Sequence, residues 1–73
     1  MNRLKVFGKN VRTYRKQAGL AQQDLAVIIG IDRSYLSEIE NGHRNPSLLV
    51  AFAIADALNC SLSLLLKDYP SAE

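Results

Sequence analysis

The sequence has 73 residues, of which 48 % are hydrophobic, and this length suits one domain with a modest core. Its net charge of +2 and pI of about 8.9 allow a nucleic-acid partner but do not require one. One cysteine excludes an internal disulfide, and one cysteine with one histidine leaves no cluster for a structural zinc site. No signal peptide and no run of about eighteen apolar residues is present, so we expect a cytoplasmic protein that does not enter a membrane.

Residues 3–18 form the first predicted helix, which Asn2 caps. Apolar residues recur in it at intervals of three and four and form a single stripe: Leu4, Phe7, Val11, Tyr14 and Ala18. Basic residues occupy its polar flanks: Lys5, Lys9, Arg12 and Lys16. Each of these is either a solvated charge or a phosphate contact, and for Arg12 we predict the phosphate contact.

The stretch from residue 22 to residue 41 is predicted to be two short helices joined by a turn. Leu25, Ala26 and Ile29 share one face of the first helix, as helical spacing requires. Gly30 ends that helix, because glycine takes the left-handed conformation of a helix end at little steric cost. Asp32 is expected to cap the second helix, since its carboxylate can accept free backbone N–H groups of the next turn.

The second of these helices spans residues 33–41, with Leu36 and Ile39 facing inward. Ala26 suits a position where two helices cross closely, because a larger side chain would push them apart. Asn41 and Gly42 end the helix, with Gly42 in the left-handed conformation. An apolar residue at 25, a small residue at 26, a glycine at 30 and apolar residues at 31, 36 and 39 together predict a helix-turn-helix.

This pattern resembles the phage-repressor-like (Xre/Cro type) family of helix-turn-helix DNA-binding proteins. The resemblance covers nearly the whole chain, through FGKNVRTYRKQAGLAQQDLA in front, SYLSEIENGHRNPSL behind and ADALNCSLSLLLKD at the last helices. It implies an all-α fold, a compact five-helix lambda-repressor-like domain over residues 1–68, followed by a short C-terminal tail at 69–73. Small stand-alone members that the chain resembles include restriction-modification controller proteins and Cro-type phage repressors.

From this resemblance we expect sequence-specific binding of double-stranded DNA, as a homodimer on a palindromic operator, and regulation of transcription. The helix at 33–41 would enter the major groove and present four side chains to base edges: Arg33, Ser34, Ser37 and Glu38. Arg33 is the predicted bidentate contact to guanine. Glu38 is either a solvated acid at the groove edge or an acceptor for a cytosine amino group, and it can also act by rejecting other sites.

Phosphate contacts are predicted around the edge of this surface. Gln22 can direct its amide at a phosphate, beside the backbone N–H groups at the start of its helix. Tyr35 either packs against the domain or touches the sugar-phosphate backbone, and the resemblance implies phosphate contacts for Asn41 and Arg44. Ala21 departs from the family, which usually has a capping Ser or Thr there, and the lost cap typically costs about 1 kcal/mol.

Arg15 and Glu40 both lie beside apolar stripes, where an unpaired charge is costly. We predict that the two side chains satisfy one another, and an ion pair at these positions is also what the resemblance implies. Its role would be structural, fixing the helix at 33–41 against the first helix.

The fourth predicted helix starts at Pro46 and Ser47 and runs to about Leu58. Its predicted core face comprises Leu48, Ala51, Phe52, Ile54, Ala55 and Leu58. The opposite face is apolar where the family usually places charges. Cys60 follows in a turn and is expected to be a small buried hydrophobe.

The predicted homodimer interface combines that opposite face with the last helix, which Ser61 is expected to cap and which runs to about Lys67. It comprises Leu49, Val50, Ala53 and Leu64. Two alternatives stay open. The last helix can fold over Leu49 within the monomer, and Val27 and Ile28 can widen the patch or form a separate one.

Two other kinds of function were compared with DNA binding. An antitoxin-like interaction module would use the apolar face to hold a different protein. An enzyme is not expected, because nothing pairs a nucleophile with a base, His43 has no partner at motif spacing, and no glycine-rich phosphate loop appears. We therefore expect no metal, no cofactor and no small-molecule substrate.

Overall fold

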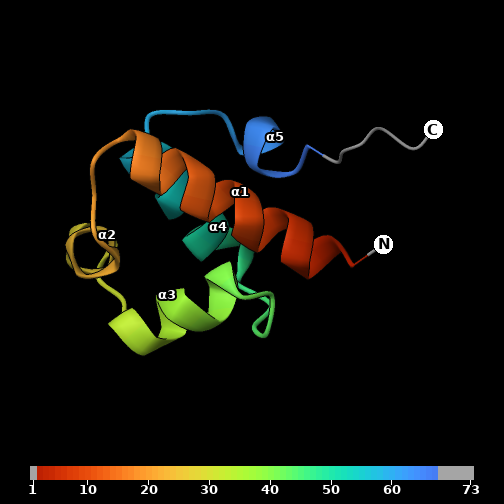
Figure 1. The fold of residues 1–73 in the computed structure, drawn as a ribbon, viewed down its shortest axis with the longest axis horizontal. Coiled ribbons are helices and arrows are strands. Elements are labelled where there is room, and N and C mark those ends of the chain that lie inside the picture. Colours follow the sequence, from red (N-terminus) through yellow and green to blue (C-terminus); the bar gives the residue numbers. More distant parts are fainter. Residues whose placement is uncertain (1, 68–73) are drawn as a thin grey trace.

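Five helices and no strand make up residues 2–67, the part of the chain that this computed structural model describes (Figure 1). They are α1 (Arg3–Gln17), α2 (Gln22–Ile29), α3 (Arg33–Glu40), α4 (Leu48–Ala57) and α5 (Leu62–Leu65). The predicted all-α, five-helix fold is confirmed, whereas the predicted tail at 69–73 lies outside the described residues. Within residues 2–67, no helix has both the length and the apolar character needed to cross a membrane.

Side-chain caps define where three of the helices begin. Asn2 caps α1, and its Oδ1 accepts the backbone N–H of Leu4 at 3.0 Å. Ser47 caps α4 in the same way, because its Oγ accepts the N–H of Val50 at 3.1 Å. The capping backbone is extended, so α4 begins after Ser47 and is shorter than predicted. Ser61 caps α5, a single turn that ends before the predicted boundary.

The turn of the helix-turn-helix follows the left-handed geometry expected of glycine. Gly30 has a φ of +77°, and the N–H groups of Gly30 and Ile31 both donate to the carbonyl of Ala26, at 2.9 and 3.0 Å. Asp32 has the extended backbone of a cap, but its carboxylate accepts no capping hydrogen bond among the described residues. The predicted side-chain cap at Asp32 is therefore wrong, and the extended backbone alone starts α3.

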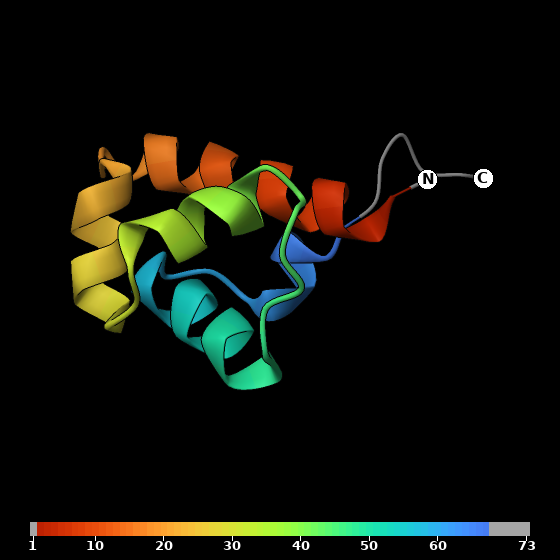
Figure 2. The same cartoon turned by 90° about the horizontal axis from the view of Figure 1, so that it is seen from below.

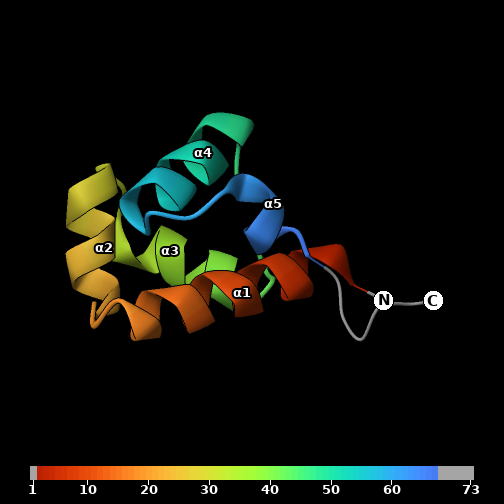
Figure 3. The same ribbon diagram turned by 90° about the horizontal axis from the view of Figure 1, so that it is seen from above.

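One core connects all five helices. α3 packs against α1 and α2, while α4 contacts both α2 and α5 (Figures 2 and 3). The side chains with 0 % exposure come from every helix: Val11, Leu25, Leu36, Ile39, Ile54 and Leu65. Because α3 contributes two of these from one side, its inner face is fixed and its other face is left outside the core.

α1 and α3 cross closely at Gly8, a position that the sequence pattern did not single out. A Cβ placed on Gly8 would collide with the backbone carbonyl oxygens of Ile39 and Glu40, the latter at 2.6 Å. Backbone atoms cannot swing away as a side chain can. The absence of a side chain at residue 8 therefore sets how closely α3 approaches α1.

Asn10 joins α1 to the end of α5. It is 1 % exposed, and its Nδ2 donates to the carbonyls of Leu65 at 2.9 Å and Lys67 at 3.0 Å. Carbonyl groups at a helix C-terminus lack partners within the helix, so a buried amide donor satisfies them. This link holds α5 in place even though the helix has a single turn.

The predicted core face of α4 is wrong at two positions. Leu48 is 66 % exposed and Phe52 is 47 % exposed, although both were assigned to the core. They lie one helical turn apart on the same flank of α4. This helix is apolar on nearly every side, so the sequence offers no polar face from which its orientation can be read. Ala18, the last member of the predicted α1 stripe, is also exposed, because α1 has already ended there.

Candidate nucleic-acid interface

α3 presents a continuous outer face of polar side chains. Leu36, Ile39 and Glu40 are buried against the domain. The outer residues are those predicted to meet DNA, namely Arg33, Ser34, Ser37, Glu38 and Asn41. Arg33, Ser34 and Asn41 are exposed, and the other two are half-buried. Figure 1 shows α3 at one edge of the molecule, where no other helix covers this side.

A hollow of about 330 Å³ opens where α2 meets α3. Gln22 lines it from α2, and Arg33, Ser34 and Ser37 line it from α3. The structure thus brings together predicted phosphate-contacting and base-contacting residues from both helices of the helix-turn-helix. Such a hollow beside a protruding helix offers donors and acceptors from two directions.

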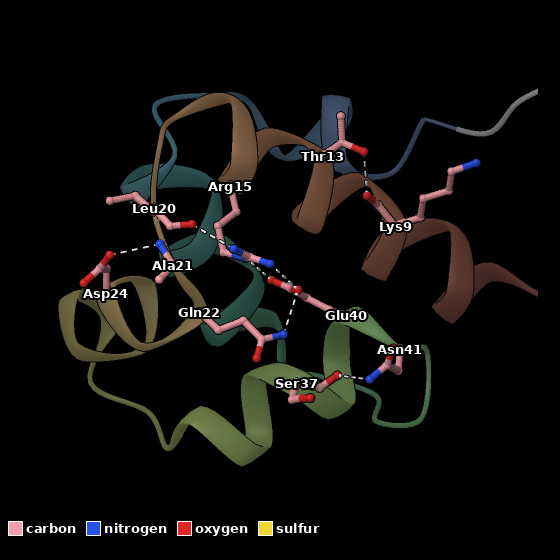
Figure 4. A network of polar contacts seen from close by, with 10 residues as sticks. All are labelled: Lys9, Thr13, Arg15, Leu20, Ala21, Gln22, Asp24, Ser37, Glu40 and Asn41. Carbon is pink, nitrogen blue, oxygen red and sulfur yellow. Dashed lines mark hydrogen bonds and ion pairs between the residues drawn. The ribbon is translucent and has the colours of Figure 1, made fainter.

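A buried charge network lies directly beneath this surface (Figure 4). Arg15 Nε lies 2.6 Å from Glu40 Oε2, and Arg15 Nη2 donates to Glu40 Oε1 at 3.0 Å. The remaining Nη1 donates to the carbonyl of Leu20 at 2.7 Å. The two side chains are only 8 % and 2 % exposed, and this two-bonded geometry compensates their loss of hydration. The pair ties α1 to the last turn of α3.

Gln22 belongs to the same network. Its Nε2 donates to Glu40 Oε1 at 3.0 Å, so the amide is oriented by the buried carboxylate (Figure 4). The amide was predicted to contact a phosphate, and its partner within the protein was not predicted. At the same helix end, Ala21 lacks a capping side chain, and its own N–H donates to Asp24 Oδ2 at 2.9 Å. That bond supplies the reciprocal half of a capping box.

Glu38 and Arg44 form a second ion pair, at the exposed end of the interface. Arg44 Nε donates to Glu38 Oε1 at 2.9 Å, and Arg44 Nη2 lies 2.8 Å from the same oxygen. The guanidinium also lies over the ring of Tyr35, 5.1 Å from its centroid. This cluster was not predicted, because Glu38 and Arg44 are six residues apart and a turn separates them.

The turn that carries Arg44 has a defined path. Gly42 has a φ of +75°, and a Cβ there would lie 2.5 Å from Lys5 Cγ and 2.8 Å from Lys5 Cα. The N–H of His43 donates to the carbonyl of Glu38 at 2.8 Å. The backbone beside Arg44 is therefore held against α1 and α3.

Two other predicted phosphate contacts lie near this region. Asn41 is exposed at the end of α3, and its Nδ2 donates to the carbonyl of Ser37 at 3.0 Å. Arg12 is exposed on α1, one turn after Gly8, the residue that touches α3. Arg12 is therefore exposed on α1, and Asn41 is exposed at the end of α3.

The predicted interface residues between protomers lie on α4 and α5. Leu49 is 81 % exposed and Leu64 is 38 % exposed, whereas Val50 and Ala53 are half-buried. The last helix does not cover Leu49, so the alternative in which α5 buries this residue within the monomer is wrong. Other large apolar side chains are exposed on α4 and directly after α5, and they are Leu48, Phe52 and Leu66.

A comparison with known proteins identifies the protein family of this chain. A model of the helix-turn-helix family HTH_3 matches residues 11–65, most of the chain. The chain belongs to this helix-turn-helix family. The matched range runs from the middle of α1 to the end of α5 and includes the whole of the α2–turn–α3 surface.

Three known proteins are similar to this chain over most of their own length. The control protein C.MunI from Mycoplasma sp is 41 % identical over 70 residues, which cover 93 % of this chain and 95 % of that protein. The restriction-modification controller protein C.AhdI from Aeromonas hydrophila has a TM-score of 0.82 and 40 % identity, over 85 % of this chain and 94 % of its own. SinR, a master regulator for biofilm formation solved in complex with DNA, has a TM-score of 0.79 and 34 % identity, over 84 % of this chain and 98 % of its own. The relatives of this helix-turn-helix chain thus include controller proteins.

Proposed function

We propose that this helix-turn-helix protein binds double-stranded DNA sequence-specifically as a homodimer and regulates transcription, with α3 in the major groove. The observation that carries the proposal is the uncovered polar face of α3, whose inner face is fixed by the Arg15–Glu40 pair. A rigidly held helix with exposed donors and acceptors suits the reading of base edges. The SinR structure, solved with DNA, supports this use of the same fold.

The contacts divide into two classes in this proposal. Arg33, Ser34 and Ser37 reach base edges from the first turns of α3. The exposed Arg12, together with Asn41 and Arg44, contacts phosphates and sets the position of α3 on the duplex. Gln22 assists at the start of α2, with its amide already oriented by Glu40.

A second copy of the chain is the proposed occupant of the apolar surface on α4 and α5. Leu49 is the most exposed of the large hydrophobic residues there; Leu48 and Phe52 are exposed on the same helix, and Leu64 is exposed on α5. A two-fold contact between two such surfaces would leave both α3 helices uncovered. It can place them about 34 Å apart, one turn of DNA, which matches the half-site spacing of a palindromic operator.

Selection from a random pool of duplexes, followed by sequencing, tests this proposal. A palindromic consensus is the expected result. For a dimer that neutralises about six to ten phosphates, affinity should fall by about 10³–10⁵ between 50 and 200 mM salt. A pool that gives no consensus contradicts sequence-specific binding, and a consensus without two-fold symmetry contradicts the homodimer.

A further inference from the structure

The position of Glu38 needs a physical explanation. The residue lies on the outer face of α3, where a carboxylate is repelled by DNA phosphates. In the free protein this charge is paired, since Nε and Nη2 of Arg44 both lie within 2.9 Å of Glu38 Oε1. Arg44, which is proposed to contact a phosphate on this side of α3, is thus already paired with the Glu38 carboxylate.

We propose that Glu38 is a specificity-determining residue that competes with DNA phosphate for Arg44. This inference rests on the proposed DNA-binding function. One guanidinium faces two possible anions, and it must leave Glu38 to contact a phosphate fully. On DNA of arbitrary sequence, the free energy gained from the Arg44–phosphate contact is offset by the free energy lost with the Arg44–Glu38 pair. Where a base amino group faces Glu38, the carboxylate gains a new donor and Arg44 is released to the phosphate.

The geometry permits this exchange without a rearrangement of the fold. The side chains of Arg44 and Glu38 are 53 % and 45 % exposed, and exposed ion pairs contribute little, about two- to fivefold in an equilibrium constant. The backbone next to Arg44 is held in place by the His43 N–H bond to Glu38 and by the contact of Gly42 with Lys5. Movement is needed only in the Arg44 side chain, which can rotate while Tyr35 supports one side of it.

A double-mutant cycle on random-sequence duplex DNA isolates the competition. The four proteins are the wild type, Glu38→Gln, Arg44→Ala and the double variant, each compared at several salt concentrations. Glu38→Gln keeps the shape of the side chain and removes its charge. Asp56→Asn, which removes one carboxylate from the exposed side of α4, is the matched control for net charge, with the dimer state checked by sedimentation.

We expect Glu38→Gln to tighten binding to random DNA by about two- to fivefold per protomer, and by less on the preferred site. The slope of log affinity against log salt should steepen by about 0.9 per protomer, because the freed Arg44 now releases a counterion. In the Arg44→Ala background the gain from Glu38→Gln should be smaller. Asp56→Asn should change neither the affinity for random DNA nor the salt slope to this extent.

An equal or larger gain in the Arg44→Ala background overturns the inference. It would mean that Glu38 acts on DNA independently of Arg44, or that Arg44 serves only to mask its charge. Such a result leaves the proposed function intact, since the wild type still binds its site. If the wild type binds no duplex at all, the proposed function and this inference fall together.

Discussion

The guanidinium of Arg15 and the carboxylate of Glu40 are joined by two hydrogen bonds, 2.6 and 3.0 Å long, across the contact between α1 and α3. The carboxylate also accepts from Gln22. A pair with so little exposure contributes to the position of α3 and not only to overall charge balance. Removal of one partner should therefore lower the free energy of unfolding.

Arg15→Met should lower the free energy of unfolding by about 3–5 kcal/mol, because the Glu40 carboxylate is left buried without its cation. Glu40→Leu should have a similar effect, and the double variant should lose much less than the sum. Urea melts of the three proteins give these values. Lys16→Met, on the exposed side of α1, is the control and should stay within about 0.5 kcal/mol. Strictly additive losses would show that the two residues do not interact.

Gly8→Ala should destabilise the fold by about 1–3 kcal/mol, because the added Cβ meets the carbonyls of Ile39 and Glu40. The direction is diagnostic, since alanine in a helix interior is normally more stable than glycine by about 0.5–1 kcal/mol. Thermal and urea melts measure it. A gain in stability would contradict the close crossing of α1 and α3 at this residue.

Asn10→Ala should lower the free energy of unfolding by about 1–3 kcal/mol, as the carbonyls of Leu65 and Lys67 lose their buried donor. Thr13→Ala is the matched control on the same helix. Its Oγ1 donates only to the carbonyl of Lys9 at an exposed position, so its effect in urea melts should stay within about 0.5 kcal/mol. Equal losses from the two variants would argue against the Asn10 link to α5.

Arg33→Ala should weaken binding to the selected operator by about 1–3 kcal/mol and affect random DNA much less. The reason is that a bidentate contact to guanine distinguishes sequences, whereas a phosphate contact does not. Titrations of both duplexes at one salt concentration decide the matter. If the two losses are equal, Arg33 contacts phosphate and not a base.

Leu49→Lys should give a folded monomer with weakened operator binding, because a charge is placed in the proposed interface between protomers. Sedimentation and circular dichroism measure assembly and folding. Val27→Lys is the control, since Val27 is 66 % exposed on α2 and lies outside the proposed surface. An unchanged dimer for Leu49→Lys, or a monomer for Val27→Lys, would place the interface elsewhere. A wild type that is monomeric when pure would favour a different protein as the partner of this surface.

Helical spacing was a sound guide where a helix has one polar and one apolar side. It placed Leu36 and Ile39 in the core, and it put Arg15 and Glu40 beside apolar stripes, where the structure joins them. On α4 the same reasoning failed at Leu48 and Phe52, because an apolar residue on every side gives no preferred orientation.

Other contacts between distant segments could not be predicted from sequence patterns. Gly8 and Asn10 look like ordinary residues of an amphipathic helix until α3 and the end of α5 are placed against them. The Gln22 amide has an internal partner that only the arrangement of α2 and α3 reveals. The pairing of Glu38 with Arg44 depends on the path of the turn between them.

The shortness of α5 has a consequence for how the chain acquires its structure. A helix of four residues cannot persist alone, because its nucleation is not repaid by enough hydrogen bonds. It can form only after α1 offers Asn10 and the core offers a place for Leu65. The helix-turn-helix can thus be assembled while the C-terminal helix is still unformed. In native-state hydrogen exchange the amides of α5 should therefore exchange earlier than those of α1 and α3, so the part of the proposed protomer surface that α5 supplies would form last and unfold first.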